Sequence, residues 1–458
     1  MATFVLLLTG AVIVAAAVRA YWVSRDSLHP TIFLAPMMLY IFAFRPWILV
    51  RANSFAPYFD DSKLLFVLCF KLAACICFYA GCLHGITRVV RQSRLTPEMY
   101  LTPQGRDRAY LIGCALGLLG VAAYVFLIVV AGGFTAVYSD AYGTTAIVSG
   151  YIYEAPMLSL PAILFLAIAR RGLRLQPIDV ALVILFISPM LLHGMLGARR
   201  GPSFFALGTM FLAWYIYAQR RPSLVKLLIV IGCLGALALS LVTYRSQIYL
   251  GSKFDIDPNR FIENVFRPEV IRPGEDVLDS SGVILTVAKH GHVNWGTRWL
   301  VTYLVRPIPK QLWRTKYADC GFDWLENHPG SHGYTDWEWS SAAGFIPAYG
   351  CAVGFDASMF MDFSWAGFIG CYLFGFFFAW VWRKERLSRG VWHLLLVAAL
   401  VLSIYVPTQD TSAVLFRWLF MAIPTVMCWQ FFVGRRIVYC RTPRPKPDAA
   451  ATGKGSER

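Results

Sequence analysis

Two adjacent arginines, Arg199 and Arg200, lie in the segment GARRGPS, a very short connection between two apolar blocks. Gly201 and Pro202 favour a sharp reversal of the chain, which would place both guanidinium groups at the mouth of a helix bundle. A planar guanidinium binds two phosphate oxygens at once. The segment therefore predicts a clamp for phosphate, although two arginines that merely extend to a membrane interface would leave the same pattern.

A longer segment, 244–340, holds many more basic residues. Acidic residues balance them in its first part, but from 284 to 317 basic residues occur among aromatic ones with no acidic residue. Such a surface suits a phospholipid carrier of sugars, because cations would bind its diphosphate and rings would stack on the sugars. The candidate binding residues here are Arg245, Arg298, Arg306, Lys310 and Arg314.

A general base would be needed at such a site, because a sugar hydroxyl that attacks an anomeric carbon must lose its proton. The departing diphosphate would be stabilised by the cations. The sequence does not rank the candidates for this base, which are His290, His292, His328, His332, Asp336 and Glu338.

A metal site is the alternative use of His328 and His332, with Glu326 and Asp336 nearby. The intervening Pro–Gly pair interrupts the helical spacing that would support such a site. No CxxC pair occurs, so the usual zinc and redox spacings are missing. We therefore expect neither a metal nor another cofactor.

Asp410 and Arg417 are ionisable residues near the end of an apolar region, Asp410 within PTQDTS and Arg417 seven residues later. Ionisable groups at membrane depth are costly and usually face a partner or a cavity. The simplest account is that the two pair with each other. Both are also counted among the candidate substrate-binding residues.

The composition that must position these residues is that of a membrane protein. Of 458 residues, 57% are hydrophobic and only 15% are charged, and the mean hydropathy is +0.55. The net charge of +16 does not indicate nucleic acid, because Arg and Lys cluster at the ends of apolar blocks. Most of the 11 cysteines lie inside those blocks; Cys320 and Cys351 lie on the predicted outer side and could pair.

About eleven membrane spans are predicted from blocks of roughly twenty apolar residues. The first block has no basic residue before it and Arg19 and Arg25 after it, which is typical of a retained span with an outer N-terminus rather than a signal peptide. The predicted spans are 2–18, 31–50, 64–86, 109–131, 151–169, 179–197, 203–218, 224–243, 362–382, 391–408 and 412–433.

The basic connections fix the predicted orientation. Arginines and lysines crowd the connections at 88–108, 170–174, 220–226 and 383–389 and the tail from Arg435. All five fall on one side when the spans alternate, and the positive-inside rule makes that side the cytoplasm. The segment 244–340 then lies outside the cytoplasm.

The expected organisation is an all-α polytopic helix bundle. Residues 1–243 would form about eight spans, 244–340 an outer and largely helical cap, 341–433 a re-entrant segment followed by three spans, and 434–458 a disordered basic tail. Trp295, Trp299 and Tyr303 recur at four-residue spacing, which predicts a helix with its aromatic rings at the membrane interface.

The run YLVRPIPKQLWRTK (Tyr303–Lys316) resembles a signature of the Wzy-type oligosaccharide repeat unit polymerases. GARRGP resembles the short Arg-Gly turn of that family, and residues 340–371 resemble its Ser/Gly-rich re-entry, so the resemblance covers most of 195–382. One departure is the lack of a clear paired Arg-x10-Gly motif. By motif, the diphosphate-binding set would be Arg199, Arg200, Arg306, Lys310 and Arg314.

The resemblance implies a metal-independent glycosyltransferase in the bacterial inner membrane. It would transfer a growing chain from undecaprenyl diphosphate to a new lipid-linked repeat at the periplasmic face, for O-antigen, capsule or exopolysaccharide. A chain-length regulator and a flippase would be its possible partners.

Three other functions stay open. A ligase of the same superfamily would share the spans and the loop. A transporter or flippase would be expected to show internal repeats and broken helices in matching halves, which this sequence lacks. A membrane acyltransferase would use a histidine inside the bundle, such as His193.

Overall fold

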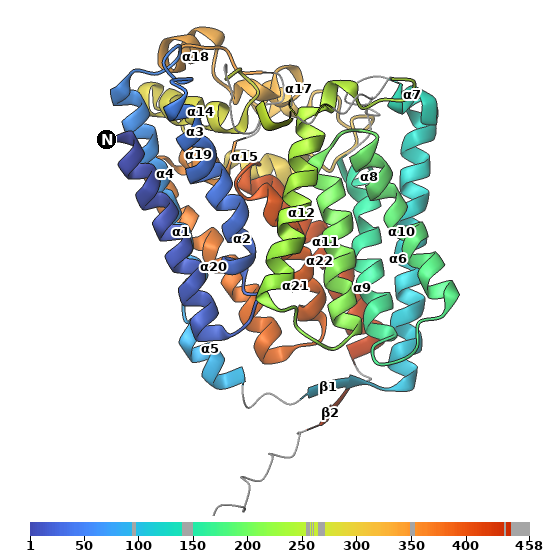
Figure 1. Ribbon diagram of the computed structural model, residues 1–458. Coiled ribbons are helices and arrows are strands. Elements are labelled where there is room, and N and C mark those ends of the chain that lie inside the picture. Colours follow the sequence, from blue (N-terminus) through green and yellow to red (C-terminus); the bar gives the residue numbers. More distant parts are fainter. Residues whose placement is uncertain are drawn as a thin grey trace, which may run out of the picture.

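The apolar blocks form helices, the structure that satisfies every backbone polar group within hydrocarbon. The computed structural model describes residues 1–93, 98–139, 150–252, 257, 259, 261–263, 271–348, 353–434 and 437–440. The predicted all-α membrane bundle is confirmed as an architecture (Figure 1). Within the described ranges, nine helical segments are long and apolar enough to cross a membrane: Ala2–Ser24, Pro30–Arg51, Asp61–Gln92, Pro103–Val130, Ile152–Ala169, Pro177–Met195, Leu224–Thr243, Phe355–Ser388 and Thr411–Val433.

Successive helices of the bundle run alternately down and up in the view of Figure 1. The long helices are α1 (Ala2–Ser24), α2 (Pro30–Leu39), α3 (Arg45–Arg51), α4 (Asp61–Leu83), α6 (Pro103–Val130), α9 (Ser159–Ala169), α10 (Pro177–Met195), α11 (Arg200–Tyr217), α12 (Leu224–Thr243), α20 (Gly367–Ser388), α21 (Val391–Val401) and α22 (Thr411–Cys428). The predicted spans at α11 and α21 are helical but fall outside the nine, because α11 begins with polar residues and α21 is short.

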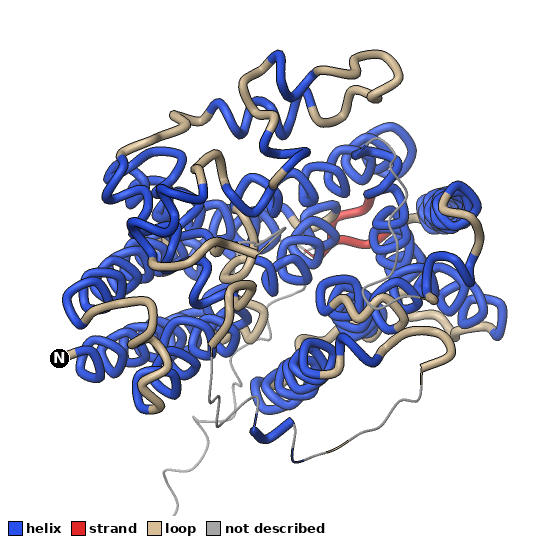
Figure 2. The backbone as a smooth tube through the Cα atoms, turned by 90° about the horizontal axis from the view of Figure 1, so that it is seen from above, coloured by secondary structure: helices blue, strands red, loops and turns tan. Residues whose placement is uncertain are grey.

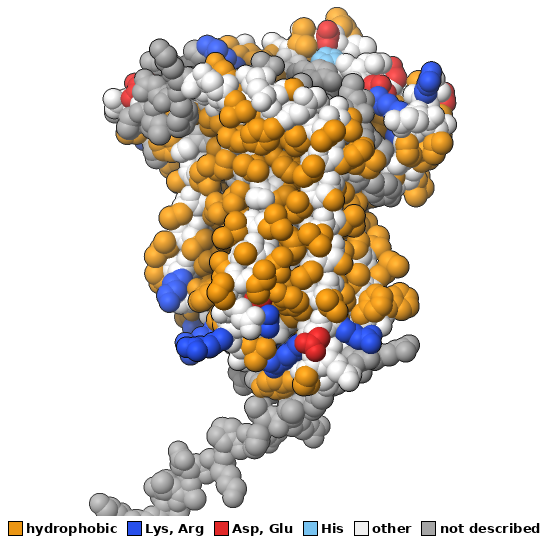
Figure 3. All heavy atoms as spheres, turned by 90° about the vertical axis from the view of Figure 1, so that its right-hand side faces the viewer, with side chains coloured by type: hydrophobic (Ala, Val, Ile, Leu, Met, Phe, Trp, Pro, Cys, Tyr) orange, Lys and Arg blue, Asp and Glu red, His pale blue; other side chains and the backbone are white. Residues whose placement is uncertain are grey.

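Glycines let two of the helices approach closely. A Cβ atom on Gly81 of α4 would lie 2.0 Å from the Tyr372 carbonyl oxygen, and one on Gly375 of α20 would lie 2.0 Å from that of Phe78. Helices in lipid associate through such close packing, since lipid tails are as apolar as the side chains. The outward faces stay apolar, and Figure 3 shows a broad hydrophobic band with Lys and Arg side chains at its lower edge.

The upper end of the bundle carries a cap formed by residues 244–348, as far as they are described (Figure 2). Its longest helix, α14, is buried along Val277–Val287 and packs against α18. The helices at this end are α7 (Phe134–Tyr138), α8 (Gly150–Glu154), α14 (Asp276–His290), α15 (Thr297–Leu300), α16 (Lys316–Asp319), α17 (Trp324–Asn327) and α18 (Asp336–Ala343).

The segment predicted to be re-entrant has two described parts. Residues 341–348 complete α18 and turn at Gly344, whose φ of 76° a side chain would oppose and whose Cβ position lies 3.0 Å from the Tyr58 carbonyl oxygen. Residues 349–352 lie outside the described residues, and with them Cys351, the predicted partner of Cys320. The helix α19 (Phe355–Phe363) follows, is buried over nearly its whole length, and leads into α20.

The predicted interfacial helix differs from the structure in how its rings lie. Trp295 precedes α15 and is 68% exposed. Trp299 instead donates its indole N–H to Asp362 at 2.6 Å, and the Tyr303 hydroxyl donates to the Ser412 carbonyl oxygen at 3.1 Å. Two of the three rings thus have hydrogen-bond partners in the bundle, and their position at headgroup level stays a prediction.

The lower end contains α5 (Ile86–Ser93) and a two-stranded sheet. The strand β1 (Glu98–Leu101) pairs antiparallel with β2 (Ile437–Cys440), with Glu98 opposite Cys440. The prediction that the tail is disordered from residue 434 is wrong for β2, because β1 offers its backbone groups as partners. Residues after Cys440 lie outside the described part of the chain.

Candidate functional site

The buried Lys316 holds the backbone around Arg306, the first arginine of the site. Arg306 directly follows the helical stretch made by α15 and a π-helical turn. The carbonyl groups at a helix end lack partners within the helix. Lys316, itself buried, donates to three of them, the carbonyl oxygens of Val305 at 3.2 Å, Arg306 at 2.9 Å and Ile308 at 2.5 Å. Burial, with the charges of neighbouring cations, lowers the pKa of Lys316.

Glu154, at the end of α8, is the carboxylate that two arginines share. Its side chain is 5% exposed. The Arg417 Nε atom lies 3.2 Å from Glu154 Oε1, and an Arg306 terminal nitrogen lies 3.9 Å from the same oxygen. The sequence reasoning missed Glu154, although an acidic residue just inside an apolar block is a costly placement that signals a partner or a cavity.

Arg199 is the third arginine of this group and lies at the N-terminal cap of α11. One of its terminal nitrogens donates to the Tyr153 hydroxyl at 2.8 Å. Within the described part of the chain, the buried Arg199 Nε and Arg417 Nη1 atoms have no hydrogen-bond partner. Buried polar groups in proteins nearly always have one, so these two nitrogens indicate a position for an acceptor that a ligand would supply.

These residues surround a cavity of about 120 Å³, which we call the upper cavity. Three arginines against one carboxylate leave two positive charges in excess. Apolar side chains such as Met157, Met190 and Phe205 complete the walls. The polar residues that line it are Tyr124, Tyr138, Tyr153, Glu154, His193, Arg199, Tyr405 and Arg417, while Arg306 reaches Glu154 from the cap.

The tyrosines add hydrogen-bonding hydroxyls and flat apolar rings. The hydroxyls of Tyr124 and Tyr138 are 2.9 Å apart, and burial together with this contact raises the pKa of Tyr138. The phenol therefore stays protonated and can donate to an anion. Sequence reasoning missed the four lining tyrosines, because a tyrosine at the end of an apolar block carries no signal that distinguishes a cavity from the membrane interface.

Gly201 is the residue of the Arg-Gly turn that leaves room for the Tyr405 side chain. A Cβ atom at this position would lie 1.8 Å from the Tyr405 hydroxyl. Glycine therefore lets Tyr405 reach the cavity, where its ring also lies under the Arg417 guanidinium, 5.0 Å from the ring centroid.

Arg200 has a different role from its neighbour. It forms an ion pair with Asp276 at 2.6 Å and so fastens the start of α14 to α11. Arg45 pairs with the adjacent Glu275 at 2.7 Å in the same way. Of the predicted arginine pair, the structure thus places Arg199 in the upper cavity and Arg200 in a contact that holds the cap.

Arg298 is also separate from the upper cavity. Its side chain is 2% exposed and pairs with Asp362 at 2.6 Å and Asp410 at 3.0 Å. The predicted Asp410–Arg417 pair is therefore wrong. Asp410 caps α22 and Arg417 lies seven residues further on, which at 1.5 Å per residue places their backbones about 10 Å apart along the helix.

The remaining predicted binding residues lie on the cap. Arg245 and Arg314 are exposed, and Lys310 forms an ion pair with Glu326. The stretch 284–317 has no acidic residue of its own, yet its cations find carboxylates from other segments, such as Glu154 and Asp362.

The histidines and acids predicted as general bases also belong to the cap. His290 contacts the Ser341 hydroxyl at 3.0 Å, and His292 lies 3.5 Å from Glu338. Although burial raises the pKa of Glu338, hydrogen bonds from the Thr335 backbone and side chain and the nearby histidines lower it overall, so its role at the start of α18 is structural.

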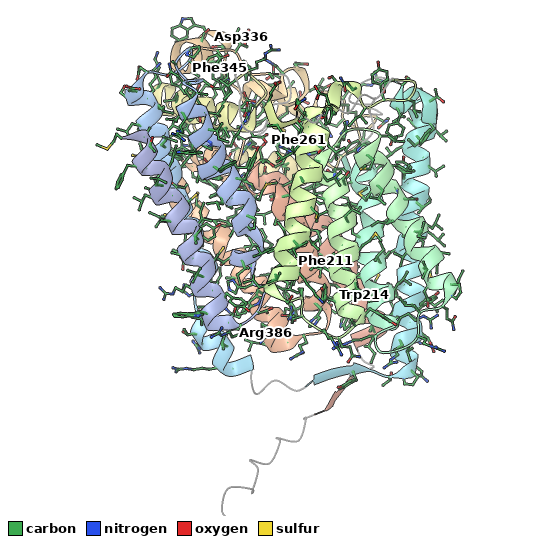
Figure 4. The ribbon with its side chains drawn as sticks, in the orientation of Figure 1. Phe211, Trp214, Phe261, Asp336, Phe345 and Arg386 are labelled. Carbon is green, nitrogen blue, oxygen red and sulfur yellow. The ribbon has the colours of Figure 1, made fainter. Side chains whose placement is uncertain are left out.

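The last three candidates lie in the same part of the cap. His332 is 4% exposed and faces Trp324, following the turn that contains His328. Asp336 is exposed at the top of the cap, near Phe345 (Figure 4). All six candidates are described residues, and none lines the upper cavity. No three His, Cys, Asp or Glu side chains among the described residues are grouped closely enough to hold a metal ion.

Comparison with known proteins identifies no relative of this chain. No family model, no curated protein and no solved structure matches the chain.

Proposed function

We propose that this protein is a membrane-embedded glycosyltransferase that polymerises oligosaccharide repeats carried on undecaprenyl diphosphate. The observation that carries the proposal is a tyrosine-lined cavity with two excess positive charges, which Arg199 and Arg417 line and where Arg306 reaches Glu154 from the cap. Arg199 belongs to the GARRGP motif and Arg306 to the YLVRPIPK motif. Of the two motifs that resemble the Wzy-type polymerases, one thus supplies a lining residue and the other an arginine that contacts the lining residue Glu154.

The proposal includes a topology of eleven spans in the bacterial inner membrane. The basic connections at the lower end would face the cytoplasm, and the cap would face the periplasm. The upper cavity lies at the cap end of the bundle, where lipid-linked repeats would reach it from the outer leaflet. A diphosphate there is an anion at the membrane surface, which guanidinium groups match in charge and geometry.

In the proposed reaction, a hydroxyl oxygen of the incoming repeat attacks the anomeric carbon of the growing chain. A new glycosidic C–O bond forms, and the bond from that carbon to the diphosphate breaks with its electron pair on the departing oxygen. The arginines stabilise the charge that develops on undecaprenyl diphosphate. Tyr138 and Tyr153 are placed to donate hydrogen bonds to the same oxygens.

Glu154 is the proposed general base. In the described structure Arg417 and Arg306 hold its carboxylate. When the diphosphate pairs with these arginines, a Glu154 oxygen becomes free to accept the proton of the attacking hydroxyl. Glu154 thus replaces the cap histidines as the proposed base, because it is the group nearest to the cations.

The test is a polymerisation assay with purified protein in detergent and undecaprenyl-diphosphate-linked repeat isolated from a strain that lacks this gene. The proposal predicts a ladder of glycan lengths, lost in Glu154→Gln and retained in Glu326→Gln, which changes an exposed carboxylate of the cap. Detergent leaves no compartments, so a ladder excludes pure transport. Single repeats on the final acceptor in the deletion strain indicate a polymerase, whereas acceptors with no glycan would indicate a ligase and contradict the proposal.

A further inference from the structure

A second cavity, of about 220 Å³, lies at the opposite end of the bundle. We call it the lower cavity. Its arginines come from three separate connections: Arg171 follows α9, Arg220 and Arg221 follow α11, and Arg386 and Arg389 lie at the end of α20. Figure 4 labels Arg386 and Trp214 near this end. The positive-inside bias explains basic residues at this end, but it does not require five of them to line one cavity.

Two buried carboxylates only partly balance these arginines. Arg221 pairs with Glu385 at 2.6 Å and lies 3.8 Å from Asp26, while Arg386 lies 3.7 Å from Asp26. Arg220, Arg221, Arg386 and Arg389 against two carboxylates leave two positive charges in excess. The carboxylates are 1–2% exposed, whereas the side chains of Arg221 and Arg386 are 32% and 25% exposed. Asp26 is not among the lining residues, whereas the more deeply buried Glu385 lines the cavity together with the arginines.

The lower cavity also contains hydrogen-bond donors that have no acceptor among the described residues. Within the described residues, the buried Nε atoms of Arg386 and Arg389 have no hydrogen-bond partner. A buried donor in this state is costly unless something binds it. The two excess charges and the two open donors point to the same kind of ligand, an anion with several oxygen atoms.

Two strained backbone positions shape the same cavity. Arg389 has φ 49° and Gln219 has φ 56°, and both line the cavity. Residues other than glycine rarely adopt positive φ, and such conformations persist where surrounding contacts or a ligand require them. These turns bring the ends of α11 and α20 to opposite sides of the cavity.

The rest of the lining resembles the boundary between headgroups and acyl chains. Apolar residues such as Leu212 and Leu396 form part of the wall, next to Tyr215. The neighbouring Trp214 is 56% exposed on the outside of the bundle, where aromatic rings mark the membrane interface. Basic cavities between helices on this side of a membrane are suited to acidic lipid headgroups.

We infer that the lower cavity binds a phosphate group, that of an acidic phospholipid headgroup in the leaflet next to the basic connections. The guanidiniums bind the phosphate oxygens, and the bound lipid joins three connections that otherwise repel one another. This site is independent of the upper cavity and of the proposed reaction. Free phosphate offers the same chemistry without the acyl chains, and the experiment separates the two sources.

The experiment measures the melting temperature of the purified, full-length protein in dodecyl maltoside with added phosphatidylglycerol, phosphatidylcholine or inorganic phosphate. Phosphatidylglycerol is expected to raise the melting temperature in a saturable way, and the other two are not. In Arg389→Gln the apparent affinity for phosphatidylglycerol is expected to fall about tenfold or more, since a charge-assisted hydrogen bond is lost. Arg383→Gln is the matched control, because Arg383 is on the same helix and donates to the His84 carbonyl oxygen.

Several results would overturn the inference. Equal effects of phosphatidylcholine would indicate apolar packing alone, and inorganic phosphate as effective as the lipid would make free phosphate the ligand. An unchanged affinity in Arg389→Gln would remove the arginines from the site. If that variant does not fold, Arg220→Gln, which changes an exposed arginine of the same cavity, is measured in its place with the same expectation.

Discussion

The upper cavity and the buried cluster around Arg298 use the same residue type in opposite ways. Arg298 pairs with two carboxylates, those of Asp362 and Asp410, and its side chain is only 2% exposed. In the upper cavity, Arg306 and Arg417 share Glu154, and two guanidinium nitrogens, one of them on Arg199, lack a partner among the described residues. The comparison shows that an excess of cations with open donors, not the presence of arginine, separates a binding site from a structural contact.

The largest expected effect is on stability and comes from the cluster around Arg298. Arg298→Ala would leave Asp362 buried without its cation, and breaking a buried ion pair costs about 3–5 kcal/mol. We expect a large fall in the melting temperature and in the amount of membrane-inserted protein. Arg314→Ala, at an exposed position, is the control. Equal melting temperatures for the two variants would show that Arg298 is not a structural contact.

The next effect is on activity and comes from the upper cavity. Arg417→Ala removes a cation that would face the departing diphosphate, and losing one such contact lowers the rate about 100- to 1000-fold. Insertion into the membrane should stay normal, since Arg306 still faces Glu154. The measurement is ladder formation by equal amounts of Arg417→Ala and the wild-type protein. A variant that polymerises at the normal rate would place the reaction elsewhere.

A smaller effect is expected from the glycine of the Arg-Gly turn. Gly201→Ala would displace the Tyr405 ring, because the new methyl group would occupy the position of its hydroxyl. We expect activity to fall about 10-fold, with Gly235→Ala, where nothing lies within 4 Å, as the matched control. Tyr405→Phe is not expected to restore activity in the Gly201→Ala background, because the new Cβ atom would still lie 2.3 Å from the ring carbon Cζ. Full activity of Gly201→Ala alone would argue against the steric explanation.

The smallest effect is on the pH dependence of stability and concerns Asp279, a carboxylate that forms no ion pair with an arginine among the described residues. Asp279 on α14 is buried, and burial with the nearby charges of Asp276 and Glu275 raises its pKa to about 7, despite a hydrogen bond from the Gly274 backbone. In the unfolded chain this proton leaves near pH 4. Between these values the folded state binds more protons, so stability falls as pH rises from about 4 through about 7 and then levels off.

Asp279→Asn tests this pH dependence. The amide oxygen can still accept from the Gly274 backbone, but it does not titrate. Melting temperatures measured from pH 5 to pH 8 should therefore fall by several degrees less in the variant than in the wild type. Parallel curves for the two proteins would show that Asp279 does not contribute to the pH dependence.

The sequence predicted those parts of the molecule that depend on local pattern. Apolar blocks and basic connections are local, so the helices and their ends could be located, and Arg199 was identified from its own turn. The upper cavity, however, joins Glu154, Arg199, Arg306 and Arg417 across the chain. No spacing rule relates such positions, and the wrong Asp410–Arg417 pairing arose because closeness in sequence was taken for contact.

The most direct test of the central claim is the binding of undecaprenyl diphosphate to the detergent-purified protein. The account predicts saturable binding to the wild type, at least 10-fold weaker binding to Arg417→Ala, and unchanged binding to Arg314→Ala. Equal affinity of all three proteins, or no binding to the wild type, would contradict the assignment of the upper cavity as the diphosphate site.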